Sequence, residues 1–362
     1  MSSPTGGWLT YWPRPLQWFV LLLAAAGASQ LLGHFKVPAG AFLGPMWVAI
    51  LFGVCGASVR LPRFSFALAQ GCVGLLVAHS MTMAVLLSLA EQWWLMLGVT
   101  FFTVLLSTVV GVGMIRLGGL DASTAAWGTT PGAAAAMVAM AEDDGADSRV
   151  VATMQYVRVV CVVVTGALVS HWLGAHSTGG PDTAPPLTFD AGVVINLLLN
   201  VAILFVGVLA GRRLSGGALL VPLFIGSAIQ VSGLMEVGLP LPLMEIAYGV
   251  LGAYVGLRFD RATVRYVARR LPLMVAASLI LILLCACFAW LVAHWLDLDF
   301  LSLYLATSPG GLDAMAIIAL DTQSDVGLVL AMQTLRLFAI ILTGAYLARL
   351  VIRLTRPKEV ER

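Results

Sequence analysis

Two blocks of this chain are closely similar to each other, and this duplication constrains the fold more than any other feature. Residues 129–167 and 307–345 align without a gap at a constant offset (307 − 129 = 178), and 15 of the 39 aligned positions are identical. Each block begins with Thr-x-Pro-Gly and later contains Gln-x-x-Arg. Self-similarity on this scale indicates that the fold is built from two copies of one unit.

The composition indicates a membrane protein. Hydrophobic residues make up 60% of the chain and charged residues 10%, against roughly 25% charged residues in a soluble domain. The five cysteines show neither metal-ligand nor disulfide-framework spacing, so we interpret them as packing residues. The apolar stretches approach the ~20 residues that a spanning helix needs. Each copy contains six such elements, at about 15–34, 39–57, 64–88, 93–116, 121–142 and 148–172, and at about 192–211, 216–234, 242–257, 271–296, 299–320 and 326–350.

The fifth element of each copy carries Pro-Gly at its middle, where a helix is expected to break. Two structures fit this pattern: a kinked spanning helix, or a re-entrant hairpin that enters and leaves on one side. The positive-inside rule distinguishes them. With hairpins and a cytoplasmic N-terminus, 17 of the 20 basic residues lie inside, whereas spanning elements place nine on each side. We therefore predict hairpins and five spans per copy, and because five is odd, the two copies have opposite orientations.

The predicted fold is thus an all-α polytopic membrane protein with two inverted repeats, each of five transmembrane helices plus one re-entrant Pro-Gly hairpin. The first membrane repeat covers residues 1–175 and the second covers 191–355. A periplasmic linker rich in Gly, Pro and Thr covers 176–190, and a cytoplasmic tail covers 356–362. Both termini are predicted to be cytoplasmic.

The candidate site lies where the two copies are expected to meet. Arg158 and Arg336 each lie ten residues into their helices (158 − 148 = 10 and 336 − 326 = 10), about 15 Å along the axis and near the middle of a ~30 Å hydrocarbon core. Inverted-repeat transporters bind substrate at this depth, and half-helix N-termini there favour an anion. We predict no catalytic residue, no metal site and no cofactor. The predicted substrate-binding residues are Thr129, Thr130, Pro131, Gly132, Gln155, Arg158, Thr307, Ser308, Pro309, Gly310, Asp313, Gln333 and Arg336.

Two roles remain open for the arginines. Asp313 is the one acid near either hairpin tip, so two arginines and one aspartate leave a formal charge of about +1, which favours a small anion or carboxylate. A central arginine costs ~2.5–3.5 kcal/mol on insertion scales and needs compensation, which carbonyls freed by the helix breaks would also provide. Each arginine would then fasten its own hairpin. Asp313 itself fits a counter-ion to Arg336, a proton carrier or a cation ligand.

The repeated Thr-x-Pro-Gly, Ala-Met and Gln-x-x-Arg blocks resemble those of the bacterial AbrB-duplication membrane proteins, over about residues 15–350. The resemblance implies a bacterial inner-membrane protein, of a family labelled either ammonia monooxygenase or AbrB-type regulator of gene expression. A copper monooxygenase needs clustered ligands, and the five histidines here are dispersed. A DNA-binding regulator has a soluble β domain at its N-terminus, whereas an apolar helix is predicted from about residue 16. Any effect on gene expression would therefore be indirect.

The functional hypothesis is movement of a small organic anion, coupled to H⁺ or Na⁺. The alternative is a membrane-embedded sensor or regulator that binds a similar ligand without moving it, and an oxidoreductase ranks last. The expected partners are the lipid bilayer and the anionic solute, with a homo-oligomer left open and no direct contact with nucleic acid. No ATP-binding motif is present in the sequence, which argues against primary active transport by this chain alone.

Overall fold

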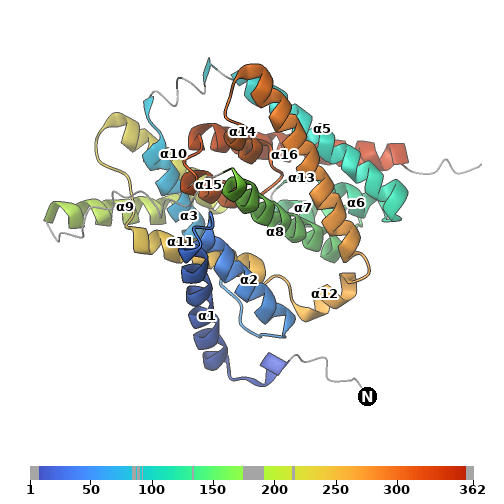
Figure 1. Ribbon diagram of the computed structural model, residues 1–362, viewed down its shortest axis with the longest axis horizontal. Coiled ribbons are helices and arrows are strands. Elements are labelled where there is room, and N and C mark those ends of the chain that lie inside the picture. The colour runs from blue at the N-terminus through green and yellow to red at the C-terminus, as the bar shows by residue number, and fades with distance from the viewer. Residues whose placement is uncertain are drawn as a thin grey trace, which may run out of the picture. The chain divides into compact units, whose positions relative to one another are not determined.

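The computed structural model describes residues 8–355 apart from 84–86, 88–89, 92, 133, 174–190 and 214–216, and the described part is helical (Figure 1). The predicted linker and C-terminal tail lie outside the described residues. A short 3-10 helix, Trp8–Tyr11, comes first, and another, Gly211–Arg213, follows α9. The α-helices of the first copy are α1 (Arg14–His34), α2 (Gly40–Val54), α3 (Arg63–Ser80), α5 (Trp93–Gly118), α6 (Ala122–Thr129), α7 (Ala134–Asp143) and α8 (Ser148–Trp172). Those of the second are α9 (Ala191–Ala210), α10 (Gly217–Ser232), α11 (Leu241–Gly256), α12 (Arg261–Val267), α13 (Leu271–Leu296), α14 (Phe300–Thr307), α15 (Leu312–Asp321) and α16 (Val326–Thr355).

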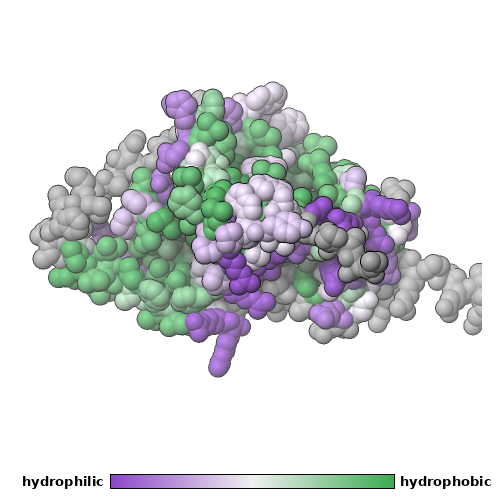
Figure 2. Space-filling model, turned by 90° about the horizontal axis from the view of Figure 1, so that it is seen from below, coloured by the Kyte–Doolittle hydropathy of each residue, from purple (hydrophilic) through white to green (hydrophobic). Residues whose placement is uncertain are grey.

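The membrane character is confirmed by helix length and surface. Among the described residues, five helices are long and apolar enough to cross a membrane, namely α1, α5, α8, α9 and α13. Five shorter apolar helices accompany them, in α2, α3, α10, α11 and the first half of α16. Many large apolar side chains are exposed, as lipid-facing residues would be, and Figure 2 shows them in green over much of one face. The fold is therefore all-α and consistent with a polytopic membrane protein.

The helices form two compact units, and each unit contains elements of both sequence copies. Unit 1 comprises residues 1–91, 164–265 and 313–327, and unit 2 comprises 92–163, 266–312 and 328–362. Unit 1 therefore holds α1, α2, α3, α9, α10, α11, α12 for the most part, and α15, while unit 2 holds α5, α6, α7, most of α8, α13, α14 and almost all of α16. The two units are defined by contacts between helices, whereas the two repeats are defined by sequence similarity, so their boundaries need not coincide.

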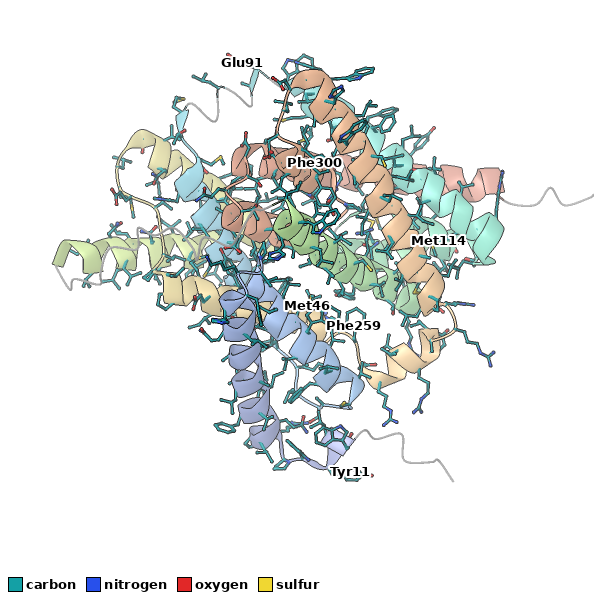
Figure 3. The ribbon with its side chains drawn as sticks, viewed as in Figure 1. Tyr11, Met46, Glu91, Met114, Phe259 and Phe300 are labelled. Atoms are coloured by element: carbon teal, nitrogen blue, oxygen red, sulfur yellow. The ribbon has the colours of Figure 1, made fainter. Side chains whose placement is uncertain are left out.

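Within unit 1, the second helix of each copy packs against the third helix of the other, α2 on α11 and α10 on α3 (Figure 1). Two glycines at equivalent positions (252 − 74 = 178) allow the close approach. A Cβ on Gly74 would lie 2.4 Å from the carbonyl oxygen of Leu219, and a Cβ on Gly252 would lie 2.1 Å from that of Phe42. Met46, fully buried on α2 and marked in Figure 3, belongs to the same interface. The second and third helices of the two copies thus pair in an exchanged way, α2 with α11 and α3 with α10.

Candidate functional site

The fifth element of each copy is broken in unit 2 at its Pro-Gly. Helix α6 ends at Thr129 and α14 ends at Thr307, each two residues before the proline. Because proline has no N–H, it cannot donate to the carbonyl four residues earlier. Those carbonyls belong to Trp127 and Leu305, and both residues are buried, so each oxygen needs another donor.

The two predicted glutamines supply that donor. Gln155 Nε2, from α8, donates to the Trp127 oxygen at 3.1 Å and to the Thr130 oxygen at 3.0 Å. Gln333 Nε2, from α16, donates to the Leu305 oxygen at 2.8 Å and to the Ser308 oxygen at 3.1 Å. The acceptors are equivalent positions in the two copies. We call each set of a glutamine, its arginine and the carbonyls they bind a clamp.

In the first clamp, the buried Arg158 side chain lies beside Gln155. Its terminal nitrogens donate to the Thr130 oxygen at 3.2 Å, to the Thr129 oxygen at 3.5 Å and to Gln155 Oε1 at 2.7 Å. The Thr129 oxygen also accepts a bond from the Ser107 hydroxyl at 2.6 Å. The Nε of Arg158 is buried and has no hydrogen-bond partner among the described residues. Donor capacity therefore remains on this arginine.

In the second clamp, the arginine makes one more hydrogen bond within the described part of the chain than its counterpart. Arg336, equally buried, donates to the carbonyl oxygens of Thr307 at 3.4 Å, Ser308 at 2.7 Å and Gly310 at 3.0 Å, and also to Gln333 Oε1. The bond to Gly310 ties the chain beyond Pro309 to α16, and no equivalent bond to Gly132 is seen among the described residues. Arg336 thus fastens its break on both sides.

The predicted hydroxyls donate within their own helices, and Thr307 donates both to the Tyr304 oxygen at 3.2 Å and to the Cys285 oxygen of α13 at 3.5 Å. Thr129 and Thr130 donate to the Ala125 and Ala126 oxygens at 2.8 and 2.7 Å, and Ser308 donates to the Tyr304 oxygen at 2.7 Å. A hydroxyl that already donates its hydrogen to a backbone oxygen can only accept a hydrogen bond from a ligand. The hydroxyls therefore suit a ligand hydroxyl or cation better than a carboxylate, which leaves the arginines as the anion donors.

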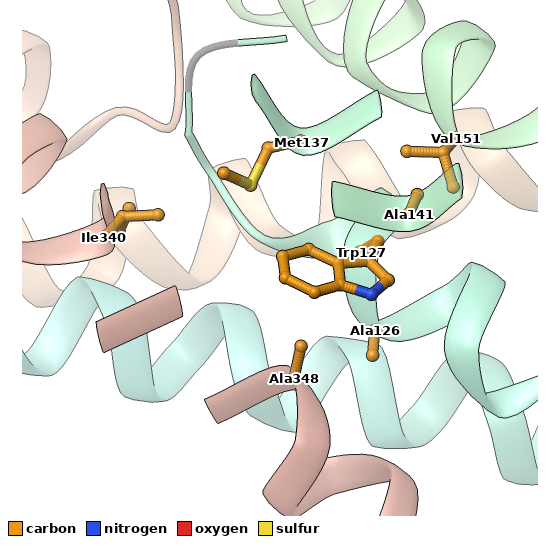
Figure 4. Close-up of a cluster of buried hydrophobic side chains, with 7 residues drawn as sticks. All are labelled: Ala126, Trp127, Met137, Ala141, Val151, Ile340 and Ala348. Atoms are coloured by element: carbon orange, nitrogen blue, oxygen red, sulfur yellow. The ribbon is translucent and has the colours of Figure 1, made fainter. Parts of the chain in front are cut away.

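The first broken element folds back on itself. Trp127, near the end of α6, donates from Nε1 to the Asp144 carboxylate at 3.1 Å, and the backbone N–H of Asp147 donates to the Thr124 hydroxyl at 3.1 Å. Residues beyond α7 therefore return to α6. Trp127 is buried in a cluster with residues of α6, α7, α8 and α16, namely Ala126, Met137, Ala141, Val151, Ile340 and Ala348 (Figure 4).

The two copies meet at the tip of this element. A Cβ on Gly132 would lie 3.1 Å from Cγ2 of Ile340 on α16. Ile340 follows Arg336 by four residues, or about one helical turn. The first Pro-Gly tip therefore lies close to the helix that carries the second clamp, within one compact unit.

Sequence reasoning missed two aspartates at the start of the broken elements. Asp121 caps α6, accepting from the N–H groups of Ser123 and Thr124 at 3.1 and 3.2 Å, and Asp299 caps α14, accepting from the N–H of Ser302 at 2.7 Å. The Ser123 hydroxyl beside Asp121 is the main cause that lowers the pKa of this carboxyl below its ordinary value. The available signal was Asp followed three residues later by Thr or Ser, repeated at the same offset of 178 (299 − 121 = 178).

Asp313, the remaining predicted residue, lies in unit 1 near the start of α15. Its carboxylate accepts a hydrogen bond from Gln70 Nε2 on α3 at 2.9 Å. At the other end of α15, the Asp321 carboxylate accepts a bond at 2.6 Å from the N–H of Ala39, which has a positive φ of 57° and caps α2. Through Asp313 and Asp321, α15 is thus bound to α3 and to the start of α2.

Comparison with known proteins identifies the family of this chain. The family model described as "Transition state regulatory protein AbrB" matches residues 42–352, which is most of the chain. The chain belongs to the AbrB family. It is 38% identical over 338 residues to "Putative regulator AbrB" of Escherichia coli (strain K12), covering 93% of this chain and 97% of that protein. It is 23% identical over 369 aligned positions to "Uncharacterized protein YhjN" of Bacillus subtilis (strain 168), with 90% of each covered. The matched range of this AbrB-family chain includes both clamps. No solved structure matches it.

Proposed function

We propose that this AbrB-family protein is a secondary transporter of the inner membrane that binds and moves a small organic anion between two inverted repeats. The observation that carries the proposal is the buried charge of unit 2. Arg158 and Arg336 are each only 4% exposed. Among the described residues of that unit, their hydrogen-bond partners are carbonyl and glutamine amide oxygens, none of them a carboxylate. A buried charge without an opposite charge is costly, and an anion would neutralise it.

The position of the charge supports the proposal. Both clamps belong to one unit, and the Gly132 tip contacts α16 one turn from Arg336. Broken helices whose ends face a site near the midplane are a feature of inverted-repeat transporters. The return of the chain beyond α7 to α6 supports re-entrant hairpins, and the exchanged contacts of Gly74 and Gly252 support the repeat symmetry.

Arg158 is the residue expected to contact the anion. The Nε of Arg158 is a buried donor without a partner among the described residues. Arg336, in contrast, donates to three carbonyl oxygens. Asp313 is then the residue for coupling to H⁺ or Na⁺, because it is an acid that follows Gly310 by three residues in the sequence and that Gln70 holds in place. On this assignment, binding and coupling use different residues.

A thermal-shift screen of the purified protein against small carboxylates, inorganic anions and amines tests the binding step. One anion class should stabilise the protein, by about 2.7 kcal/mol at a concentration of 100 Kd. Arg158→Gln should abolish this effect while unfolding normally without ligand, and Asp313→Asn should retain it. No stabilisation by any anion, or full stabilisation of the Arg158→Gln protein, would refute the proposal.

The alternative is a sensor, and the description "Putative regulator AbrB" of the relative from Escherichia coli favours it. A sensor would bind the same anion through the same residues without moving it. Flux of the identified anion into proteoliposomes separates the two: saturable uptake that Arg158→Gln abolishes supports transport, and tight binding without uptake supports the sensor.

A further inference from the structure

A second charged site belongs to unit 1, whereas both clamps belong to unit 2. A cavity of about 380 Å³ opens where the first two turns of α3 meet the end of α9 and the start of α10. Small-molecule sites have volumes of ~300–1,000 Å³. Its lining includes Arg63, Ala67 and Gln70 of α3, Val208 of α9, Arg212, and Ala218 of α10. We refer to it as the α3–α10 cavity.

The charged side chains that line this cavity are all positive. Arg63 and Arg212 both line it, and none of its lining residues is acidic. The guanidinium of Arg212 lies over the ring of Phe64, with Cζ 5.6 Å from the ring centroid, which fixes the charge at the cavity wall. Arginine binds phosphate through two parallel N–H groups, so a pair of arginines at one cavity suits a phosphate group.

Part of the cavity wall and its surroundings are apolar. Ala67, Val208 and Ala218 also line the cavity. Beyond it, α9 exposes Phe205, Val206 and Leu209 by 42%, 59% and 48%, and the Phe205 ring lies 6.5 Å from that of Phe64. A phosphate attached to acyl chains would use both the arginines and this apolar strip, whereas free phosphate would use only the arginines.

We propose that the α3–α10 cavity binds the phosphate headgroup of an anionic phospholipid. Arg63 and Arg212 both belong to the basic residues that the charge distribution assigns to the cytoplasmic side, where basic pockets between transmembrane helices bind such headgroups. Gln70 lines the cavity and donates to Asp313 at 2.9 Å. A bound headgroup therefore contacts the residue that holds α15 in unit 1.

Native mass spectrometry of the full chain in detergent tests this site with phosphatidylglycerol, with phosphatidylcholine of the same acyl chains, and with inorganic phosphate. Phosphatidylglycerol should bind about tenfold more tightly than phosphatidylcholine. Arg63→Gln and Arg212→Gln should each weaken phosphatidylglycerol binding about tenfold. Arg213→Gln is the matched control, because Arg213 is an exposed neighbour with the same charge that does not line the cavity.

Ala67→Phe is a second test, because it fills the cavity and leaves both arginines in place. It should abolish retention of phosphatidylglycerol while the thermal stability measured without lipid stays near that of wild type. Equal binding of phosphatidylcholine, displacement of the lipid by inorganic phosphate at similar concentration, or an equal loss in Arg213→Gln would each overturn the proposal. Undiminished binding in Ala67→Phe would do the same.

Discussion

The two clamps predict unequal costs for the same substitution, which separates an arginine that fastens the fold from one that keeps donors for a ligand. Methionine in place of arginine keeps an unbranched apolar stem and removes every donor. In Arg158→Met, the Thr130 oxygen keeps Gln155 and the Thr129 oxygen keeps Ser107. Neither carbonyl oxygen loses its last partner and a buried charge disappears, but Gln155 Oε1 loses its guanidinium donor. One buried acceptor left without a partner costs about 1–3 kcal/mol, so we expect the free energy of unfolding to fall by no more than about 3 kcal/mol.

Arg336→Met has a different outcome. The Ser308 oxygen keeps Gln333, but the oxygens of Thr307 and Gly310 lose the guanidinium that binds them. Gln333 Oε1 also loses its donor, as Gln155 Oε1 does in Arg158→Met. A buried acceptor left without a partner costs about 1–3 kcal/mol, so the two carbonyl oxygens add about 2–6 kcal/mol to the cost that both variants share. The cost of Arg336→Lys should lie between zero and that of Arg336→Met, because an ammonium group can reach fewer of the three carbonyl oxygens than the planar guanidinium does.

Equilibrium unfolding in mixed micelles of a mild detergent and dodecyl sulfate measures these costs. Arg336→Met should lower the free energy of unfolding by at least about 2 kcal/mol more than Arg158→Met does. Equal losses in the two variants, or a larger loss in Arg158→Met, would show that the carbonyl oxygens bound by each arginine do not determine its role.

Three further outcomes follow from other contacts. Gly74→Ala and Gly252→Ala place a Cβ within 2.4 and 2.1 Å of a backbone oxygen, so each should cost at least ~2 kcal/mol in unfolding free energy, while Gly27→Ala, with open space around it, should stabilise by up to about 1 kcal/mol. Asp121→Ala should cost ~1 kcal/mol at neutral pH. Because the pKa of Asp121 is lowered in the folded state, its contribution is present above the ordinary value of 3.8 and lost as the pH falls through the folded value, so the deficit of the variant should shrink in acid unfolding curves below about pH 3.8. Asp260→Asn removes the ion pair with Arg60, whose side chains are 39% and 50% exposed, and should change thermal stability by no more than ~1 kcal/mol, an effect that salt reduces.

The positions of the elements could be predicted from the sequence, because apolar length and Pro-Gly breaks determine where helices lie in a membrane. The breaks fall between Thr129 and Ala134 and between Thr307 and Leu312, as the duplication indicates. One boundary was wrong: the third element was expected to reach about residue 88, but α3 ends at Ser80, since the chain at Met81 is extended. The short helix α12 near Arg261 was not among the predicted elements.

The partners of the candidate residues were harder to predict, because they are mostly backbone oxygens that no side-chain pattern reveals. The sequence places Gln155 and Gln333 near the breaks, but not on the carbonyls that the prolines leave without a donor. That assignment was available in principle from the rule that proline frees the carbonyl four residues earlier. The packing of α2 on α11 was not available, because contacts between distant segments depend on the arrangement of the whole unit.

The difference between the clamps shows how one duplicated motif can serve structure and binding together. Both copies kept the glutamine that replaces the missing proline donor, and both kept the arginine beside it. In the second copy, the arginine also reaches Gly310 beyond the proline, so its donors go to the backbone. In the first copy, Ser107 satisfies the Thr129 oxygen independently, so Arg158 is less needed by the fold and keeps a buried donor. A charge that the fold does not need, yet retains inside a membrane protein at an energetic cost, is the strongest argument that an anion binds at Arg158.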